Sequence, residues 1–200
     1  MKKLSMVALL LSLFVMSCSE AVNVYEIEIV NGYPVVTGSE NDLMWYIDDP
    51  DNPTTRINLM TFSNATEYCR NMDHSDFNDW RLPTITELRT LVAGFRDIEP
   101  DGRCRVREDC LHKICLFRGQ KSEDDYPCSN KSDDGEFNGP GPGGCYFDDV
   151  WREYCGRYWS TSEVTDSENQ VFQLDFTKPS IFISGKESSF VGFPRCVRNR

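Results

Sequence analysis

The sequence predicts an α+β domain in which two helices pack on a mostly antiparallel sheet, with a long disulfide-rich insertion. Three observations lead to this fold class. Strand-like runs lie toward both ends of the chain, two segments of helical spacing lie between them, and a cysteine-rich stretch separates the helices from the later strands. A chain of 200 residues, 40% of them hydrophobic, is expected to form one domain with its own core.

Three strands are expected first. Apolar and polar residues alternate over residues 23–30, and the Asn31-Gly32 pair that follows is a turn signal. Residues 34–37 and 43–47 are expected to form two further strands. The amino-terminal part of the domain therefore contributes strands to the sheet.

Two helices are expected next. Residues 61–72 place apolar side chains on one helical face, with Thr61 as the N-cap: Phe62, Ala65, Cys69 and Met72. In the second helix Thr84 and Glu87 match a capping box, and the buried face begins with Leu88 and Leu91.

The insertion spans residues 95–156 and holds six cysteines. Residues 139–144 consist only of glycine and proline, which cannot hold a helix or a strand. Because such a segment has too little apolar surface to order itself, cross-links are expected to replace the missing core. Strands resume after it, and they are expected at residues 158–162, 171–176, 180–184 and 195–198.

The first 17 residues are expected to be a lipoprotein signal peptide. Two lysines precede an apolar run, residues 4–16, that is too short to span a bilayer. The run leads into Val-Met-Ser-Cys at residues 15–18, which resembles the bacterial lipobox, where a signal peptidase cleaves before a diacylated cysteine. An ordinary signal peptide with an incidental cysteine is the alternative.

Cleavage there would leave Cys18 as an acylated N-terminus, residues 18–22 as a tether and residues 23–200 as the domain. The lipid bilayer is then the first expected partner, since each buried acyl methylene contributes about 0.8 kcal/mol to anchoring. We expect the protein in the bacterial cell envelope. The absence of aspartate at Ser19 favours the outer membrane over the inner membrane.

The chain is acidic, with a formal net charge of −11, and losing the two lysines of the signal peptide changes this to −13. Like-charge repulsion argues against nucleic acid as a partner and disfavours sulfated or other polyanionic ligands. Acidic stretches are usually solvated surface. Binding of a hard cation is the alternative for the acids of the insertion: Asp133, Asp134, Glu136, Asp148 and Asp149.

Eight cysteines remain after Cys18: Cys69, Cys104, Cys110, Cys115, Cys128, Cys145, Cys155 and Cys196. An even number in an exported chain indicates a disulfide framework. A zinc site is disfavoured, because no Cys-x-x-Cys occurs and His74 and His112 are the only histidines. The six cysteines of the insertion allow fifteen pairings, and the sequence does not choose among them.

Four blocks of the sequence, in order, resemble the Lcl C-terminal domain family. They are Asn41-Asp42-Leu43-Met44-Trp45, then Asp79-Trp80-Arg81-Leu82-Pro83-Thr84 with Glu87-Leu88, then Tyr158-Trp159-Ser160-Thr161-Ser162, and finally Arg195-Cys196-Val197-Arg198. The first block departs from the usual Thr-Gly-Leu-Met-Trp pattern at its first two positions. Together the blocks cover most of the chain outside the insertion.

The resemblance implies a C-type-lectin-like fold related to the formylglycine-generating enzyme superfamily. Such folds typically join a helix cysteine to a cysteine of the last strand, which implies a Cys69–Cys196 bond worth about 4–5 kcal/mol in the loop-entropy model. Arg81 is expected to bind loop carbonyls or a carboxylate such as Glu87. The signature residues are expected to be structural: Trp45, Trp80, Arg81, Leu82, Pro83, Glu87, Trp159 and Arg195.

No catalytic residue and no cofactor are predicted. His74 lies between acids, but nothing places a nucleophile and an oxyanion hole beside it. The motifs by which lectins of this fold bind sugar through calcium, Glu-Pro-Asn or Gln-Pro-Asp followed by Trp-Asn-Asp, are absent from the corresponding places. Some family members are adhesins for sulfated glycans, a ligand that the negative charge of this chain disfavours.

Three hypotheses for function follow. The favoured one is a non-enzymatic surface module that binds a glycan or a protein. The second is a structural envelope lipoprotein without a small ligand. The third is an oxidative enzyme of the formylglycine-generating branch, whose chemistry needs a reactive cysteine pair that holds copper. Free thiols distinguish the first from the third: none supports binding, and two in the insertion would support the enzyme.

Overall fold

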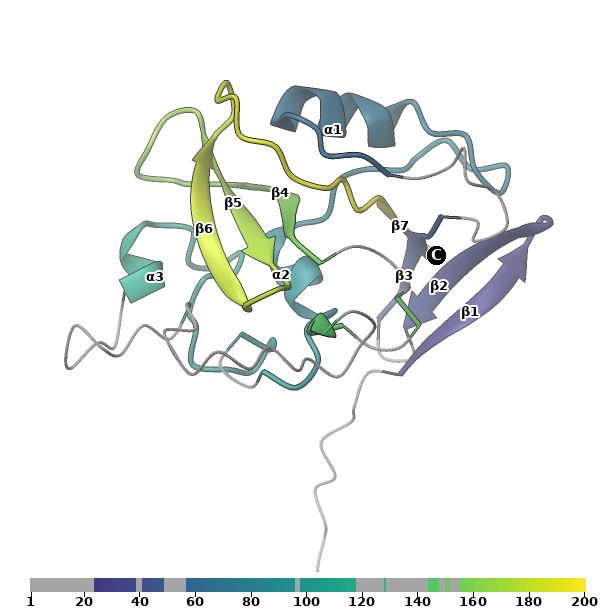
Figure 1. Cartoon of the computed structure of the whole chain (residues 1–200), viewed down its shortest axis with the longest axis horizontal. Coiled ribbons are helices and arrows are strands. Elements are labelled where there is room, and N and C mark those ends of the chain that lie inside the picture. The colour runs from purple at the N-terminus through teal and green to yellow at the C-terminus, as the bar shows by residue number, and fades with distance from the viewer. Residues whose placement is uncertain are drawn as a thin grey trace, which may run out of the picture.

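The computed structural model describes residues 24–38, 41–48, 57–95, 98–117, 128, 144–147, 150–151 and 155–200. Within these residues the chain is an α+β fold with two antiparallel sheets and three short helices (Figure 1). The strands are β1 (Tyr25–Val30), β2 (Tyr33–Gly38), β3 (Leu43–Tyr46), β4 (Arg157–Glu163), β5 (Gln170–Asp175), β6 (Ser180–Gly185) and β7 (Val197–Asn199). The helices are α1 (Phe62–Arg70), α2 (Ile85–Arg89) and α3 (Ile114–Phe117).

One sheet has four strands in the order β1-β2-β3-β7, so the last strand lies beside the third. Asn31 and Gly32 join β1 to β2 with φ angles of 51° and 88°, the conformation of a type I′ turn. This turn favours tight hairpins, and the register runs without interruption from Tyr25 opposite Gly38 to Val30 opposite Tyr33. The turn signal in the sequence therefore marks a real hairpin.

The other sheet has three strands in the order β4-β5-β6. The expectation of a single sheet is wrong, because β4 pairs with β5 and does not extend the first sheet. Alternating residues identify strands, but they carry little information about which strands pair. A register shift between Trp159 and Glu163 interrupts the regular pairing of β4 with β5.

The segment between β6 and β7 connects the two sheets, and in Figure 1 it passes beneath α1. Gly192 exchanges two backbone hydrogen bonds with Met60, each 2.9 Å long. The Phe193 N–H donates to the carbonyl of Arg157 in β4, at 2.7 Å. Where this segment ends and β7 begins, Val197 exchanges backbone hydrogen bonds with Arg81, at 2.8 and 3.0 Å. The family blocks around residues 81, 158 and 195 thus meet along this segment.

The two expected helices are present and shorter than expected. Helix α1 begins after Thr61, which occupies the N-cap position without a side-chain cap bond, and ends at Arg70. Its residues Ala65 and Cys69 are fully buried. Helix α2 has the expected capping box but only five residues, and the buried side chains Leu91 and Val92 lie in the turns that follow it.

The insertion contributes to the core, contrary to the expectation that cross-links replace its core. Its fully buried apolar side chains pack in the larger of two hydrophobic clusters: Ile98, Val106, Phe147 and Trp151. These residues follow no helical or strand period, so the sequence pattern did not reveal them. Helix α3 also lies in the insertion and was not predicted. The smaller cluster lies against α1 and includes Trp80, Leu82 and Trp159.

Candidate functional site

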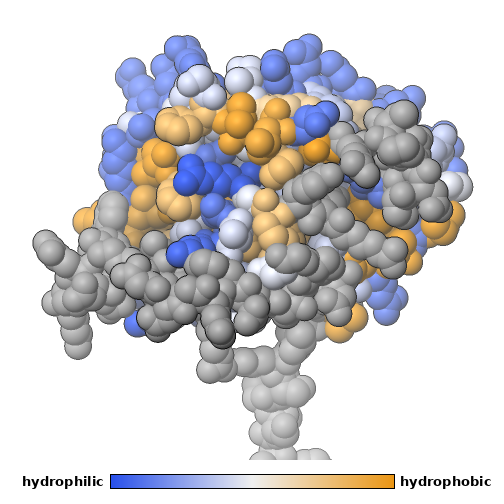
Figure 2. Space-filling model, in the orientation of Figure 1, coloured by the Kyte–Doolittle hydropathy of each residue, from blue (hydrophilic) through white to orange (hydrophobic). Residues whose placement is uncertain are grey.

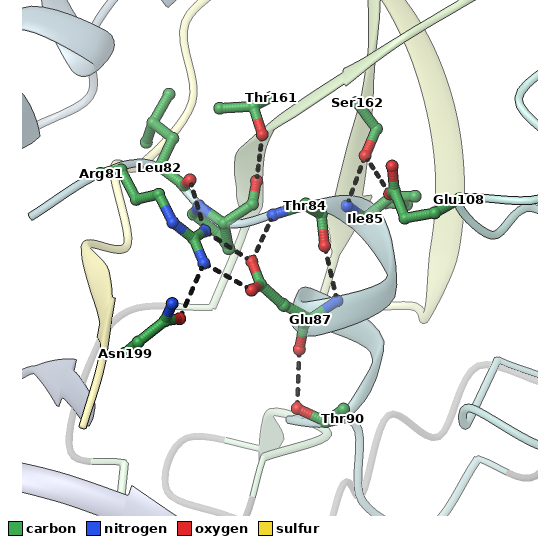
Figure 3. Close-up of polar contacts among 11 residues, drawn as sticks. Arg81, Leu82, Thr84, Ile85, Glu87, Thr90, Glu108, Thr161, Ser162 and Asn199 are labelled. Atoms are coloured by element: carbon green, nitrogen blue, oxygen red, sulfur yellow. Dashed lines mark hydrogen bonds and ion pairs between the residues drawn. The ribbon is translucent and has the colours of Figure 1, made fainter. Parts of the chain in front are cut away.

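Arg81, Glu87 and Thr84 form the centre of the second family block. Two nitrogens of the Arg81 guanidinium donate to the two carboxylate oxygens of Glu87, at 2.8 and 2.7 Å (Figure 3). One of these oxygens also accepts the backbone N–H of Thr84 at 2.7 Å, and the Thr84 hydroxyl accepts the N–H of Glu87 at 3.1 Å. The predicted Arg81–Glu87 contact and the predicted capping box therefore share one carboxylate.

This arrangement keeps both groups charged. Burial alone would raise the pKa of Glu87, but the hydrogen bonds from Arg81 and from the Thr84 N–H outweigh it and lower that pKa below its ordinary value. The hydrogen bonds to Glu87 raise the pKa of Arg81. A bidentate pair of this kind fixes the direction of the chain from residue 81 into α2.

The third family block, residues 158–162, forms hydrogen bonds with the start of α2. The Thr161 N–H donates to the carbonyl of Pro83 at 2.7 Å. The Ser162 hydroxyl accepts the N–H of Ile85 at 2.8 Å and donates to the carboxylate of Glu108 (Figure 3). Ser162 thereby joins β4, α2 and the insertion through one buried oxygen.

The signature tryptophans Trp45, Trp80 and Trp159 are each at most 2% exposed, which excludes them as platforms for stacking a sugar ring in this structure. The Trp80 indole N–H donates to the carbonyl of His74 at 3.2 Å, and that of Trp159 donates to the carbonyl of Met60 at 2.8 Å. They act as core residues, in agreement with the prediction.

Arg195 is fully buried among three aromatic rings. Its guanidinium carbon lies 4.6 Å from the ring centroid of Trp151, 5.0 Å from that of Tyr158 and 5.4 Å from that of Phe147. Cation–π attraction is strongest when the cation is desolvated, as it is here. Because Trp151 and Phe147 belong to the insertion and Tyr158 to β4, Arg195 links the insertion to the sheet.

All eight cysteines after Cys18 lie in the described residues, and each is in a disulfide bond. Cys69 of α1 pairs with Cys196, directly before β7, as the family resemblance implies. The insertion contains the other three bonds, Cys104–Cys128, Cys110–Cys115 and Cys145–Cys155. The structure thus selects one of the fifteen pairings that the sequence left open.

Comparison with known families agrees with this geometry. Residues 34–198 match the sequence model of the Lcl C-terminal domain. The chain belongs to the Lcl C-terminal domain family. Searches of curated proteins and of solved structures found no significant match.

One residue of this Lcl C-terminal domain that sequence reasoning missed is Arg89, at the end of α2. Its side chain is fully buried and donates to the carbonyls of Ile98 at 2.7 Å, Val106 at 2.8 Å and Glu99 at 2.6 Å. Burial, together with the nearby charge of Arg107, lowers the pKa of Arg89 to about 10. The signal was present, since Arg89 lies four residues after buried Ile85 and three before buried Val92, at core spacing.

Several predicted positions lie outside the described residues. These are the lipidation site Cys18 and the candidate cation ligands Asp133, Asp134, Glu136, Asp148 and Asp149. In the described part of the chain no group of three His, Cys, Asp or Glu side chains is placed to hold a metal ion. None of the helices described has the length and hydrophobicity that a bilayer-spanning helix needs.

The signature tryptophans and Arg195 are engaged inside the fold, and the exposed apolar side chains lie elsewhere. Figure 2 shows apolar residues on one face where the β6–β7 segment passes beneath α1. Exposed apolar side chains of that region are Leu59, Phe190 and Val191. A second exposed apolar group lies on the β1–β2 hairpin: Ile27, Ile29 and Tyr33.

Proposed function

We propose that this Lcl C-terminal domain protein is a lipid-anchored, non-enzymatic binding module of the bacterial cell envelope. Its ligand is a glycan or a protein, and its domain has a C-type-lectin-like fold. The observation that carries the proposal is the pairing of all eight cysteines after Cys18. A thiol-dependent oxidative enzyme would need two of these sulfurs as free thiols, whereas a binding module uses them as cross-links.

The envelope location is supported by the N-terminal sequence. Two lysines, a short apolar run and Val-Met-Ser-Cys at residues 15–18 match a lipoprotein signal, with Cys18 as the acylated residue. Four disulfide bonds suit an oxidising compartment outside the cytoplasm. Ser19 directs the lipoprotein to the outer membrane in this proposal, and the bilayer is its permanent partner.

The C-type-lectin-like fold is supported by the long disulfide bond. Cys69 of α1 and Cys196 before β7 are 127 residues apart in sequence, and they join a helix to the last strand as in that fold. The first and last strands of the domain also belong to one sheet.

The nature of the ligand is constrained by charge. A mature chain with a net charge of −13 repels nucleic acids and sulfated glycans, so neutral glycans and neutral or basic proteins fit best. Calcium at the acids of the insertion would act as a bridge to a glycan if those carboxylates bind it. No residue of the chain is assigned a catalytic role in this proposal.

A binding screen tests the proposed function. The mature chain in detergent is applied to an array of neutral and sulfated glycans and to an envelope-protein panel, each with calcium and with a chelator. We expect saturable binding to a neutral glycan or to a protein. Absence of any saturable ligand would instead identify a structural envelope lipoprotein, and turnover of a thiol substrate would overturn the non-enzymatic role.

A further inference from the structure

The outer edge of β1 is an open strand edge. β1 ends the order β1-β2-β3-β7, and in the described residues no other strand pairs with that edge. The two-residue turn makes Val30 and Tyr33 a hydrogen-bonded pair, and this pairing alternates along an antiparallel ladder. The backbone N–H and C=O groups of Ile27 and Ile29 therefore point away from β2.

β1 lacks most of the features by which proteins protect such an edge, and its only charged residues are Glu26 and Glu28. It contains no proline, lysine or bulge, and its register with β2 is continuous. Ile27 is 46% exposed and Ile29 is 69% exposed, on the same face of the strand. An open edge with exposed β-branched residues is a template on which another extended segment can pair.

The hairpin is also held rigid, which reduces the entropy that a partner must overcome. The Asn31 side-chain amide at its tip donates to the carbonyl of Ser75 at 2.7 Å. The Tyr33 ring lies 5.0 Å from the ring of His74, measured between centroids. Both contacts fix the hairpin to the turn at residues 74–77.

Acidic side chains on the other face of β1 select the partner. Glu28 is neutralised by Arg200, at 2.8 Å, and accepts a hydrogen bond from Thr37 at 2.7 Å. Glu26 is exposed, and no cation among the described residues lies within ion-pair distance of it. Antiparallel self-pairing centred on Ile27 would set Glu26 of each copy beside Glu28 of the other, and because Arg200 already pairs with Glu28, it would leave Glu26 without a cation.

We propose that β1 receives an extended basic peptide segment as a fifth strand of the sheet. Residues directly opposite each other in a sheet share a face, so the segment carries apolar side chains beside Ile27 and Ile29 and lysine or arginine beside Glu26. Its pattern is an alternation of basic and apolar residues. The negative charge of the whole domain steers such a segment toward it. The inference rests on the proposed binding role and names a partner class for it.

The test uses a fluorescent eight-residue peptide in which lysine alternates with valine, titrated against the mature chain in detergent by anisotropy. One control peptide has glutamate in place of lysine, and another has four lysines followed by four valines. The alternating peptide is expected to bind saturably and at least about tenfold more tightly than either control, because only it matches the strand period and the charge. Equal binding of all three peptides would overturn the proposal.

Variants of β1 locate the site. Ile27→Pro removes an N–H that points outward and leaves the hydrogen bonds to β2 intact, so its fold, checked by circular dichroism, is expected to persist. It should weaken peptide binding by at least about tenfold through the lost hydrogen bond and the steric block. Ile27→Val is the matched control and keeps wild-type affinity. Glu26→Lys, a surface substitution, should also weaken binding and reduce its salt dependence.

Other outcomes contradict the inference. If Ile27→Pro binds the peptide as well as wild type, β1 is not the site. If sedimentation shows a dimer that Ile27→Pro abolishes, the occupant of the edge is a second copy. If the glycan and protein screen gives a saturable ligand whose binding Ile27→Pro does not change, that result would support the binding role and reject only β1 as the binding site. If neither the screen nor the peptide titration shows binding, both the binding role and the β1 site are rejected.

Discussion

Glu87 is the residue on which most contacts of the family signature converge. Its carboxylate accepts two hydrogen bonds from Arg81 and one from the Thr84 N–H, and 18% of its side chain is exposed. The Arg81 side chain is 40% exposed, so solvent screens part of the attraction. Glu87 therefore caps α2 and also pairs with Arg81. These two structural roles explain why it belongs to the family signature without giving it a role in ligand binding.

Replacing Glu87 with glutamine should destabilise the domain. The neutral amide cannot form the bidentate ion pair, and its NH2 group faces donors of Arg81. We expect a loss of about 2 kcal/mol in the free energy of unfolding at pH 7, measured by urea denaturation with the disulfide bonds intact. Glu67→Gln, at an exposed position of α1, is the matched control and should change stability little.

The effect of Glu87→Gln should depend on pH. The pKa of Glu87 is lowered in the folded state from its ordinary value of 4.5, because the hydrogen bonds from Arg81 and Thr84 outweigh its burial. Its ionisation therefore stabilises the fold fully above that value, and the contribution is lost as the pH falls through the folded-state pKa. The stability difference between wild type and variant should shrink below pH 4.5, and a difference that grows on acidification would contradict this account.

At the scale of elements, the insertion is attached to the domain by buried polar contacts. Arg89 of α2 donates to four carbonyls of residues 98–106, and Ser162 of β4 donates to Glu108. Irregular backbone that enters a core must have its carbonyls satisfied, and a buried guanidinium with several donors meets that need for a segment without a regular period. The apolar side chains of the insertion can then pack as core.

Arg89→Met should therefore release the insertion. Methionine fills similar volume but leaves the buried carbonyls of Ile98 and Val106 without the Arg89 donors, and we expect a loss of about 3–5 kcal/mol. Hydrogen exchange of residues 98–106 should increase more than that of β5. Arg105→Met, at an exposed position in the same segment, is the control. Unchanged exchange in residues 98–106 would show that another contact holds the insertion.

The elements that could be predicted from the sequence are those that depend on residues close to each other along the chain. The capping box of Thr84 and Glu87 and the Asn31-Gly32 turn depend on residues within a few positions of each other, and the structure has both. The number of sheets could not be predicted in this way, since the alternation within β4 does not show whether it pairs with β5 alone or also extends the first sheet. No role for Arg89 was predicted, since charged side chains are rarely fully buried in a core.

At the scale of the whole molecule, the disulfide bonds connect parts that the sheets leave separate. The Cys69–Cys196 bond joins α1 to the end of the chain across 127 residues, and constraining so long a loop in the unfolded state is worth about 4–5 kcal/mol in the loop-entropy model. Three further bonds lie in the insertion. A small two-sheet domain gains from these bonds a stability that does not depend on a ligand.

The binding proposal and the envelope proposal share one chemical requirement, namely that every cysteine is already used. Cys18 is assigned to lipid and the other eight to bridges, which leaves no cysteine thiol for a redox or copper centre. The binding surface then consists of side chains outside the signature, such as the edge of β1. A pair of free cysteine thiols would instead favour an oxidative enzyme over a binding module.

Peptide mapping by mass spectrometry tests this requirement most directly. The protein is extracted from membranes, free thiols are alkylated before any reduction, and the digest is analysed for cross-linked and acylated peptides. We predict an acylated N-terminal Cys18, the bridges Cys69–Cys196, Cys104–Cys128, Cys110–Cys115 and Cys145–Cys155, and no alkylated cysteine. Alkylated Cys69 and Cys196, or an alkylated pair within the insertion, would contradict the account.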